Sequence, residues 1–342
     1  MISKLLRLPL LAVASAAILG SASAQTYTHE PFHENPALHS HNYAINAMEI
    51  RLYVLGNVVV DDEEVYEEAV EGLEDSLVAI AGTLNAADPE LYSSLADIIE
   101  QLEDAVEDGA DLSDLVTEAR FLVDAARAAI LDPAINEDPV ALGALLARLM
   151  LADGGVAEGW EEIFEDELAE FVIGWAALQH SYELWAHLEP HASENQAFEV
   201  RDSLDFMAEE LFPSFLPPEG WHLMDAEAGE APAHRIVSYL EAITDATLYP
   251  QRDLATLVVL IDDLAVSACE IYAGGDSLLG EEVLAQSYYF YDENLPRMLN
   301  LFDPDLQEAI QADFEAVADT GSADECASLL ENVSSARSLL GG

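Results

Sequence analysis

The stretch GNVVVDDEEVYEEAVEG, residues 56–72, decides how we expect the chain to fold. Three valines lead into a block of carboxylates that surrounds Tyr66. Four glutamates of this block are spaced i, i+3, i+4 and i+7, so a helix carries them on one face: Glu64, Glu67, Glu68 and Glu71. The apolar residues of this region face elsewhere and can pack: Leu52, Leu55, Val58, Val65 and Val70. The stretch therefore predicts a helix with an acidic face and an apolar face.

The same layout recurs at residues 154–170 and, more faintly, at residues 274–291. Each stretch has a glycine, a short apolar link and an acidic cluster that contains an aromatic residue. The recurrence indicates an internal repeat, built from helical hairpins that stack side by side. Acidic helices that arose independently in an acid-rich chain would give the same layout, so both explanations stay open.

Helical periodicity runs through the rest of the chain. Two apolar stripes repeat at spacings of three and four residues. The first stripe comprises Leu91, Leu95, Ile98, Ile99, Leu102 and Val106, and the second comprises Leu112, Leu115, Val116, Ala119, Leu122, Val123 and Ala126. No convincing strand pattern occurs. We therefore predict an all-α fold, a bundle of roughly ten to twelve helices built from repeated hairpins.

The first 24 residues have the composition of a secretory signal peptide. Lys4 and Arg7 precede an apolar run, and an A-x-A cleavage site ends at Ala24. No later stretch reaches the ~18 uninterrupted apolar residues of a membrane span. The sequence therefore predicts a periplasmic or secreted protein that is cleaved after Ala24 and does not insert into a membrane.

The mature chain divides into four segments by composition. A His-rich segment, residues 25–41, contains two prolines and is expected to be irregular. A helical domain of two repeat-like blocks follows at residues 42–212. A Pro- and Gly-rich linker, residues 213–232, separates this domain from a C-terminal helical block, residues 233–342.

The composition is strongly acidic, with 67 Asp and Glu residues against 11 Lys and Arg and a net charge of −56. This charge excludes nucleic acid as a partner and repels anionic lipid, whereas it attracts cations. For most of the acids the simpler interpretation is a hydrated surface adapted to salt. A cation site therefore has to rest on local clusters.

Motifs typical of enzymes do not occur. The chain has no G-x-S-x-G, no H-E-x-x-H, no P-loop and no dinucleotide-binding glycine run, so we do not expect catalysis. Cys269 and Cys326 are the only cysteines and form no C-x-x-C motif. In an exported chain this pair permits one disulfide.

Histidines supply the first candidate metal ligands. Four of the nine histidines lie within thirteen residues near the N-terminus: His29, His33, His39 and His41. Neutral imidazole binds borderline metals, so this segment could capture or relay a metal ion. His180 and Glu183 form a His-x-x-Glu pair on one helical turn, the spacing found in carboxylate-bridged metal bundles. The alternatives are histidines without a role in the first case and a packed core face in the second.

Glutamate pairs supply the second set of candidate ligands. Glu158 and Glu161 form a Glu-x-x-Glu pair, as do Glu64 with Glu67 and Glu68 with Glu71. Hard oxygen ligands suit both iron and calcium. Because acids are a fifth of the chain, several such pairs are also expected by chance.

Residues 52–58, LYVLGNV, are followed by Glu64-Val65-Tyr66-Glu67 and then by two stretches with the periodicity of amphipathic helices. On these residues, the stretch 50–130 resembles the exported helical domain that precedes bacterial high-affinity iron permeases. The His180-x-x-Glu183 pair is similar, more distantly, to imelysin-like periplasmic iron-uptake proteins, although Leu178 replaces the glycine usual there. The resemblance implies a free-standing partner in iron uptake, with Glu64, Glu67 and Glu68 as metal ligands.

Two functions are therefore expected from the sequence. The first is a periplasmic metal-binding protein that captures iron, with calcium or zinc as alternatives, and passes it to a membrane iron permease. The second is a non-catalytic acidic helical scaffold or interaction protein of the cell envelope, whose acids serve solubility in salt.

Overall fold

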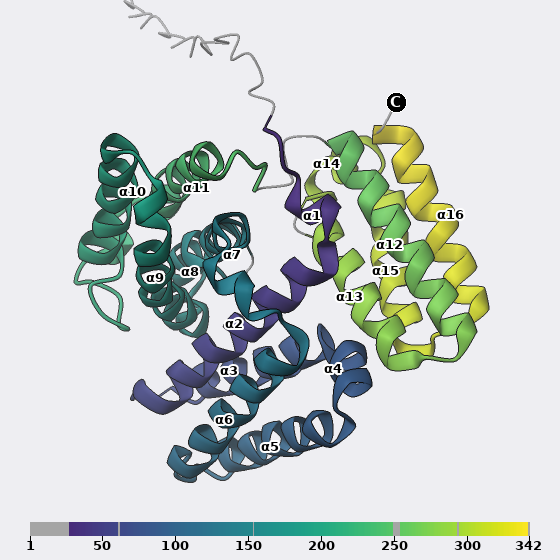
Figure 1. Cartoon of the computed structure of the whole chain (residues 1–342), viewed down its shortest axis with the longest axis horizontal. Helices are drawn as coiled ribbons and strands as arrows, with labels where there is room; N and C mark the ends of the chain where they lie inside the picture. The colour runs from purple at the N-terminus through teal and green to yellow at the C-terminus, as the bar shows by residue number, and fades with distance from the viewer. Residues whose placement is uncertain (1–26, 61, 153, 249–253, 293, 341–342) are drawn as a thin grey trace, which may run out of the picture.

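The computed structural model describes residues 27–60, 62–152, 154–248, 254–292 and 294–340. These residues fold into α-helices labelled α1 to α16 (Figure 1). Within the described ranges the one β-type pairing is an isolated bridge between His29 and Ala246. The all-α prediction is confirmed, and short helices raise the number above the ten to twelve expected. The predicted signal peptide, residues 1–24, lies outside the described residues.

The helices form three neighbouring groups along the chain (Figure 1). The first group comprises α1 (Pro31–Glu34), α2 (Pro36–Asn57), α3 (Glu64–Val78), α4 (Ala81–Ala87), α5 (Pro89–Glu107) and α6 (Ser113–Ile130). The second group comprises α7 (Pro139–Leu151), α8 (Val156–Glu162), α9 (Leu168–Leu188), α10 (Glu194–Phe206) and α11 (Glu230–Thr244). The third group comprises α12 (Leu254–Gly274), α13 (Ser277–Asp292), α14 (Pro296–Phe302), α15 (Pro304–Thr320) and α16 (Ala323–Leu340).

Short turns of other helix types connect these elements. They are the 3-10 helices Pro133–Glu137, Ile163–Glu165, Glu189–His191, Trp221–Leu223 and Ala226–Gly229, and the π-helix Met207–Leu211. The predicted linker, residues 213–232, runs between α10 and α11. These two helices pack against each other, and α11 also packs against α7.

Several helices begin with the same local signal, a capping residue followed by proline. Asp88 accepts a hydrogen bond from the backbone N–H of Leu91 at 3.1 Å, and Pro89 is the first residue of α5. Asp303 caps α15 in the same way. The cap satisfies a backbone donor that the helix leaves unpaired, and proline has the backbone angle that a first turn needs. This signal fixes where the helices start.

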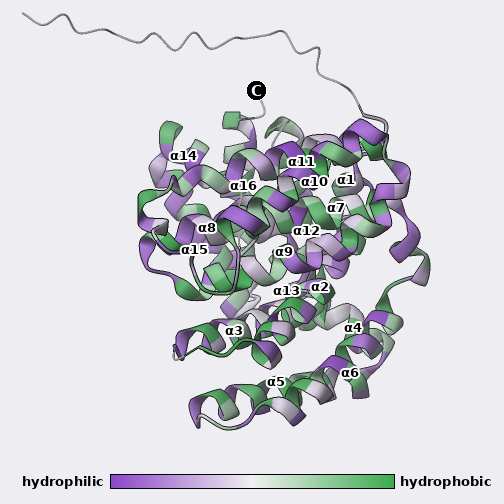
Figure 2. Ribbon diagram, turned by 90° about the vertical axis from the view of Figure 1, so that its left-hand side faces the viewer, coloured by the Kyte–Doolittle hydropathy of each residue, from purple (hydrophilic) through white to green (hydrophobic). Residues whose placement is uncertain are grey.

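The two predicted apolar stripes are confirmed in α5 and α6. Buried residues of α5 are Leu95, Ile98, Ile99, Leu102 and Val106, and those of α6 are Val116, Ala119, Val123 and Ala126. Figure 2 shows hydrophobic and hydrophilic residues alternating along α5, as expected for a helix with one buried face. The two helices pack against each other along these stripes.

Helix α2 lies at the centre, where the three groups meet (Figure 1). It contacts α3 and α6 of the first group, α7 and α9 of the second, and α13 of the third. Most of its residues from His39 to Leu55 are buried. The expectation that residues 25–41 are irregular is wrong for residues 31–34, which form α1, and for residues 36–41, which belong to α2. Asn35 caps α2, and the helix begins at Pro36.

One described stretch, Pro139–Glu165, is long and apolar enough by composition to cross a membrane. Its most apolar window is 82% buried inside the fold, and it contains α7 and α8, two separate helices. A buried core helix can be as long and as apolar as a membrane span, and the burial of this stretch is that of a core segment.

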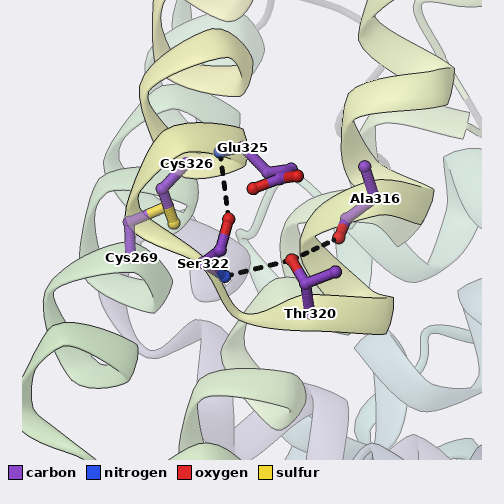
Figure 3. Close-up of a disulfide and its surroundings, with 6 residues drawn as sticks. All are labelled: Cys269, Ala316, Thr320, Ser322, Glu325 and Cys326. Carbon is purple, nitrogen blue, oxygen red and sulfur yellow. Dashed lines mark hydrogen bonds between the residues drawn. A yellow bond between two sulfur atoms is a disulfide. The ribbon is translucent and has the colours of Figure 1, made fainter.

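A disulfide between Cys269 and Cys326 joins α12 to α16 across 57 residues (Figure 3). Beside it the chain turns from α15 into α16, where Ser322 N–H donates to Thr320 Oγ1 at 3.1 Å. Ser322 Oγ accepts from Glu325 N–H at 3.3 Å and so caps α16. The disulfide therefore fixes the C-terminal helix, α16, to the long helix α12.

We predict that removing this disulfide destabilises the third group. Closing a loop of 57 residues restricts the unfolded chain by about 4 kcal/mol in the chain-entropy model. A Cys269→Ser/Cys326→Ser variant should unfold at lower urea concentration than the wild type. Wild type in reducing agent is the control and should match the variant, and equal midpoints with and without reducing agent would contradict the prediction.

Candidate functional site

The predicted acidic face of α3 forms, and its carboxylates differ in exposure. Glu64 and Glu67 lie exposed in the first turn, where the helix dipole favours negative charge. Glu68 is half-buried, and burial raises the pKa of its carboxyl, with a further contribution from Glu71. Tyr66 supports the turn before α3, because its hydroxyl donates to Val58 O at 3.2 Å. The aromatic residue of the motif is therefore structural.

A cleft between α3 and α5 gathers carboxylates of two helices. Glu67, Glu71 and Glu74 of α3 line it together with Glu103 and Glu107 of α5. Its volume is about 270 Å³. Burial raises the pKa of Glu74, and the charge of Glu103 adds to the effect. The cleft therefore brings like charges to face each other.

The second acidic stretch, in α8, also has a structural aromatic residue. Trp160 is fully buried and donates from Nε1 to Asp225 O at 2.9 Å. Its ring contacts that of Phe212, with ring centroids 6.0 Å apart. Glu158 and Glu161, the predicted ligands on either side, are half-buried. The stretch packs α8 into the second group.

The three N-terminal histidines whose side chains the structure describes have separate surroundings. His29 is exposed, with Nδ1 3.7 Å from Glu34 Oε1. His33 lies in α1, and its side chain lies outside the described part of the structure. His39 is buried, contacts the ring of Phe32 and has its pKa lowered by burial.

His41 belongs to a buried polar network that joins three helices. Its Nε2 lies 2.8 Å from Oε1 of Glu282 on α13. The same carboxylate accepts hydrogen bonds from the backbone N–H and the hydroxyl of Thr83 on α4, both at 2.8 Å. Glu282 is 1% exposed. His41 is therefore occupied by a carboxylate of the fold.

The His180–Glu183 pair lies at a second cavity, of about 720 Å³. Its facing atoms, Nδ1 of His180 and Oε2 of Glu183, are 3.7 Å apart, as the His-x-x-Glu spacing allows. Glu49 and Asp124 line the same cavity. His180 Nε2 is bonded to Asn46 Oδ1 at 2.8 Å, and burial lowers the pKa of the imidazole. His180 thus has one ring nitrogen left toward the cavity.

The predicted ligands do not come together as one metal cage. They lie on α3, on α8, on α9 and in the N-terminal segment. Over the described residues no group of three or more His, Cys, Asp or Glu side chains is arranged to hold a metal ion. Sequence spacing placed pairs on helical turns correctly, but the fold separates the pairs.

The third cavity, of about 390 Å³, was not predicted. It is lined from α2, the helix where the three groups meet, and from α3, α7, α9 and α13, and we call it the central cavity. Two arginines, Arg51 and Arg148, line it. One signal in the sequence could have identified Arg148: it is the one charged residue of the apolar segment Pro139–Leu151.

Comparison of this chain with known protein families, with curated proteins and with solved structures finds no match. The fold and its sites therefore define the class of the molecule, an acidic all-α protein with polar cavities at its helix junctions. The predicted kinship with iron-uptake proteins stays a prediction.

We predict that a Glu282→Leu substitution destabilises the fold. It removes the acceptor of three groups, and leaving a buried donor unpaired costs about 1–3 kcal/mol. The free energy of unfolding in urea should fall by roughly 3 kcal/mol. Glu281→Leu, on the neighbouring half-buried residue, is the control, and an equal small effect of both substitutions would refute the role of the network.

Proposed function

We propose that this chain is a non-catalytic acidic interaction protein of the cell envelope, whose carboxylates keep its surface hydrated in salt. One observation carries the proposal. Among the described residues only Glu241 and Glu282 are buried carboxylates; the others lie at least partly exposed, where charged side chains are normally solvated. The export that the signal sequence predicts is part of the proposal.

The acidic surface has a consequence for stability. Like charges that face each other across a helix or between helices destabilise the fold, and salt screens the repulsion. The α3–α5 cleft is where this repulsion concentrates, because Glu71 and Glu74 face Glu103 there. A surface adapted to salt should therefore lose repulsion as the salt concentration rises.

We predict that a Glu71→Gln/Glu74→Gln/Glu103→Gln variant is more stable than the wild type at low salt, by roughly 1 kcal/mol. Its unfolding temperature should also depend less on sodium chloride between low and molar concentration. The matched control neutralises three exposed acids on separate elements, Glu118, Glu219 and Glu315. If both variants follow the salt dependence of the wild type, repulsion between the carboxylates of the α3–α5 cleft does not limit the stability of the fold.

Iron capture is the second candidate function, and the cavity beside His180 favours it. Burial lowers the pKa of the imidazole, which favours the neutral form that binds metals. Glu183 lines the same cavity and could supply oxygen ligands, and so does Glu49, whose Oε2 is paired with Arg127 Nη2 at 2.6 Å. A membrane iron permease would then be the partner that receives the metal.

This second candidate makes its own prediction. Calorimetry of the mature protein with ferrous, ferric, calcium and zinc ions should find one saturable iron site, and Glu183→Gln should weaken it about ten-fold. A Glu64→Gln/Glu67→Gln/Glu68→Gln variant is the matched control and should bind as the wild type does. Absence of saturable binding at moderate salt would leave the acidic interaction protein alone.

A further inference from the structure

The central cavity has a buried floor and an exposed rim. Ser40, Arg148 and Gln286 line it and are each no more than 8% exposed. Asp75 and Val78 line its rim and are exposed. A small molecule could therefore enter from solvent and reach polar groups of three helices, α2, α7 and α13.

Arg148 lies between two aromatic rings at the floor of this cavity. The carbon at the centre of its guanidinium is 3.7 Å from the ring centroid of Tyr43 on α2 and 3.4 Å from that of Tyr289 on α13. Each ring stabilises the cation through its π-face. Because the rings cover both faces of the planar group, only its edge, with the N–H donors, is left for a partner.

Two nitrogens of this edge have no hydrogen-bond partner among the described residues. Arg148 Nε and Nη1 are buried and have no acceptor within hydrogen-bond distance. A buried charge is costly unless it is paired and hydrogen-bonded, and cation–π contacts do not replace the acceptors.

Two further side chains of the cavity also carry a buried donor without an acceptor. Gln286 Nε2 is buried without an acceptor, and so is Arg51 Nε. Arg51 lies directly over Gly72, where a Cβ would come 1.6 Å from its Nε. On these three side chains the unpaired atoms are donors, so an occupant that pairs with them has to bring acceptor oxygens. The carboxylate of Glu170 on α9 also lines the cavity. A carboxylate matches the flat edge of a guanidinium with two oxygens.

The charge around the cavity selects among molecules that carry a carboxylate. Four carboxylates line the same cavity as Arg148, those of Glu68, Asp75, Glu170 and Asp292, and the chain carries a net charge of −56. This field repels anions as they approach. A molecule with a carboxylate and a cationic group has no net charge, and its cation can face Asp75 and Glu68. A zwitterion therefore has a carboxylate for Arg148 and a cation for the carboxylates at the other end of the cavity.

We propose that the central cavity binds a small zwitterion, whose carboxylate pairs with the guanidinium edge of Arg148 and whose cationic group faces the carboxylates of α3. This site goes beyond the proposed function, which depends only on the surface. The volume of about 390 Å³ suits a molecule the size of an amino acid or a betaine.

The test is calorimetry of the mature chain with glycine betaine and with the neutral α-amino acids as probes. We expect saturable binding of one molecule per chain by at least one of these probes. Arg148→Met keeps the length and packing of the side chain but removes the donors, and should weaken binding by about 10- to 100-fold. Arg235→Met, on an exposed arginine of α11, is the matched control and should bind as the wild type does.

A second variant tests the site in case Arg148→Met does not fold. Gln286→Met removes one neutral donor and should weaken binding by about five-fold with near-native unfolding temperature. Acetate and inorganic phosphate, which lack a cationic group, should bind more weakly than the zwitterion. The proposal is overturned if no zwitterion binds, if both variants bind as the wild type does, or if acetate or phosphate binds more tightly. The salt dependence of stability is measured without any probe, so the two proposals fail separately.

Discussion

The arrangement of the helices depends on the hydrogen bonds that the buried carboxylate of Glu282 accepts. It reaches from α13 to Thr83 on α4 and to His41 on α2. A carboxylate in the interior is tolerated only when its oxygens are bonded. The close approach that this requires is possible because Gly82 precedes Thr83; a Cβ at residue 82 would come 2.4 Å from Leu279 Cα. The third group of helices is thereby docked on the first.

The same rule governs the rest of the central helix. Asn46 of α2 donates to Asn42 O at 2.6 Å and is bonded to His180 of α9, so α9 is docked through a polar contact as well. Arg148 of α7 is held by rings of α2 and α13. The second and third groups thus each meet α2 through polar side chains, and the apolar core fills the space between these contacts. The central cavity is where this filling is incomplete.

Much of the fold could be predicted from the sequence, because periodicity and capping are local. The stripe of Leu95, Ile98 and Leu102 gave the buried face of α5, and Asp88-Pro89 gave its start. The candidate site was harder. His180 and Glu183 meet because one helical turn brings them together, whereas the partner of His41, Glu282, is 241 residues away. No local pattern indicates that pairing.

The sequence by itself determined the helical class, the acidic surface and the spacing of residues along each helix, since these follow from composition and from contacts within one turn. Only the tertiary structure decided which histidines are occupied by the fold and which polar groups line a cavity. The tertiary structure also decided that Arg148, a lone charge in an apolar helix, lies between two tyrosines. The physical reason is that burial and pairing of a charge depend on side chains brought together from distant parts of the chain.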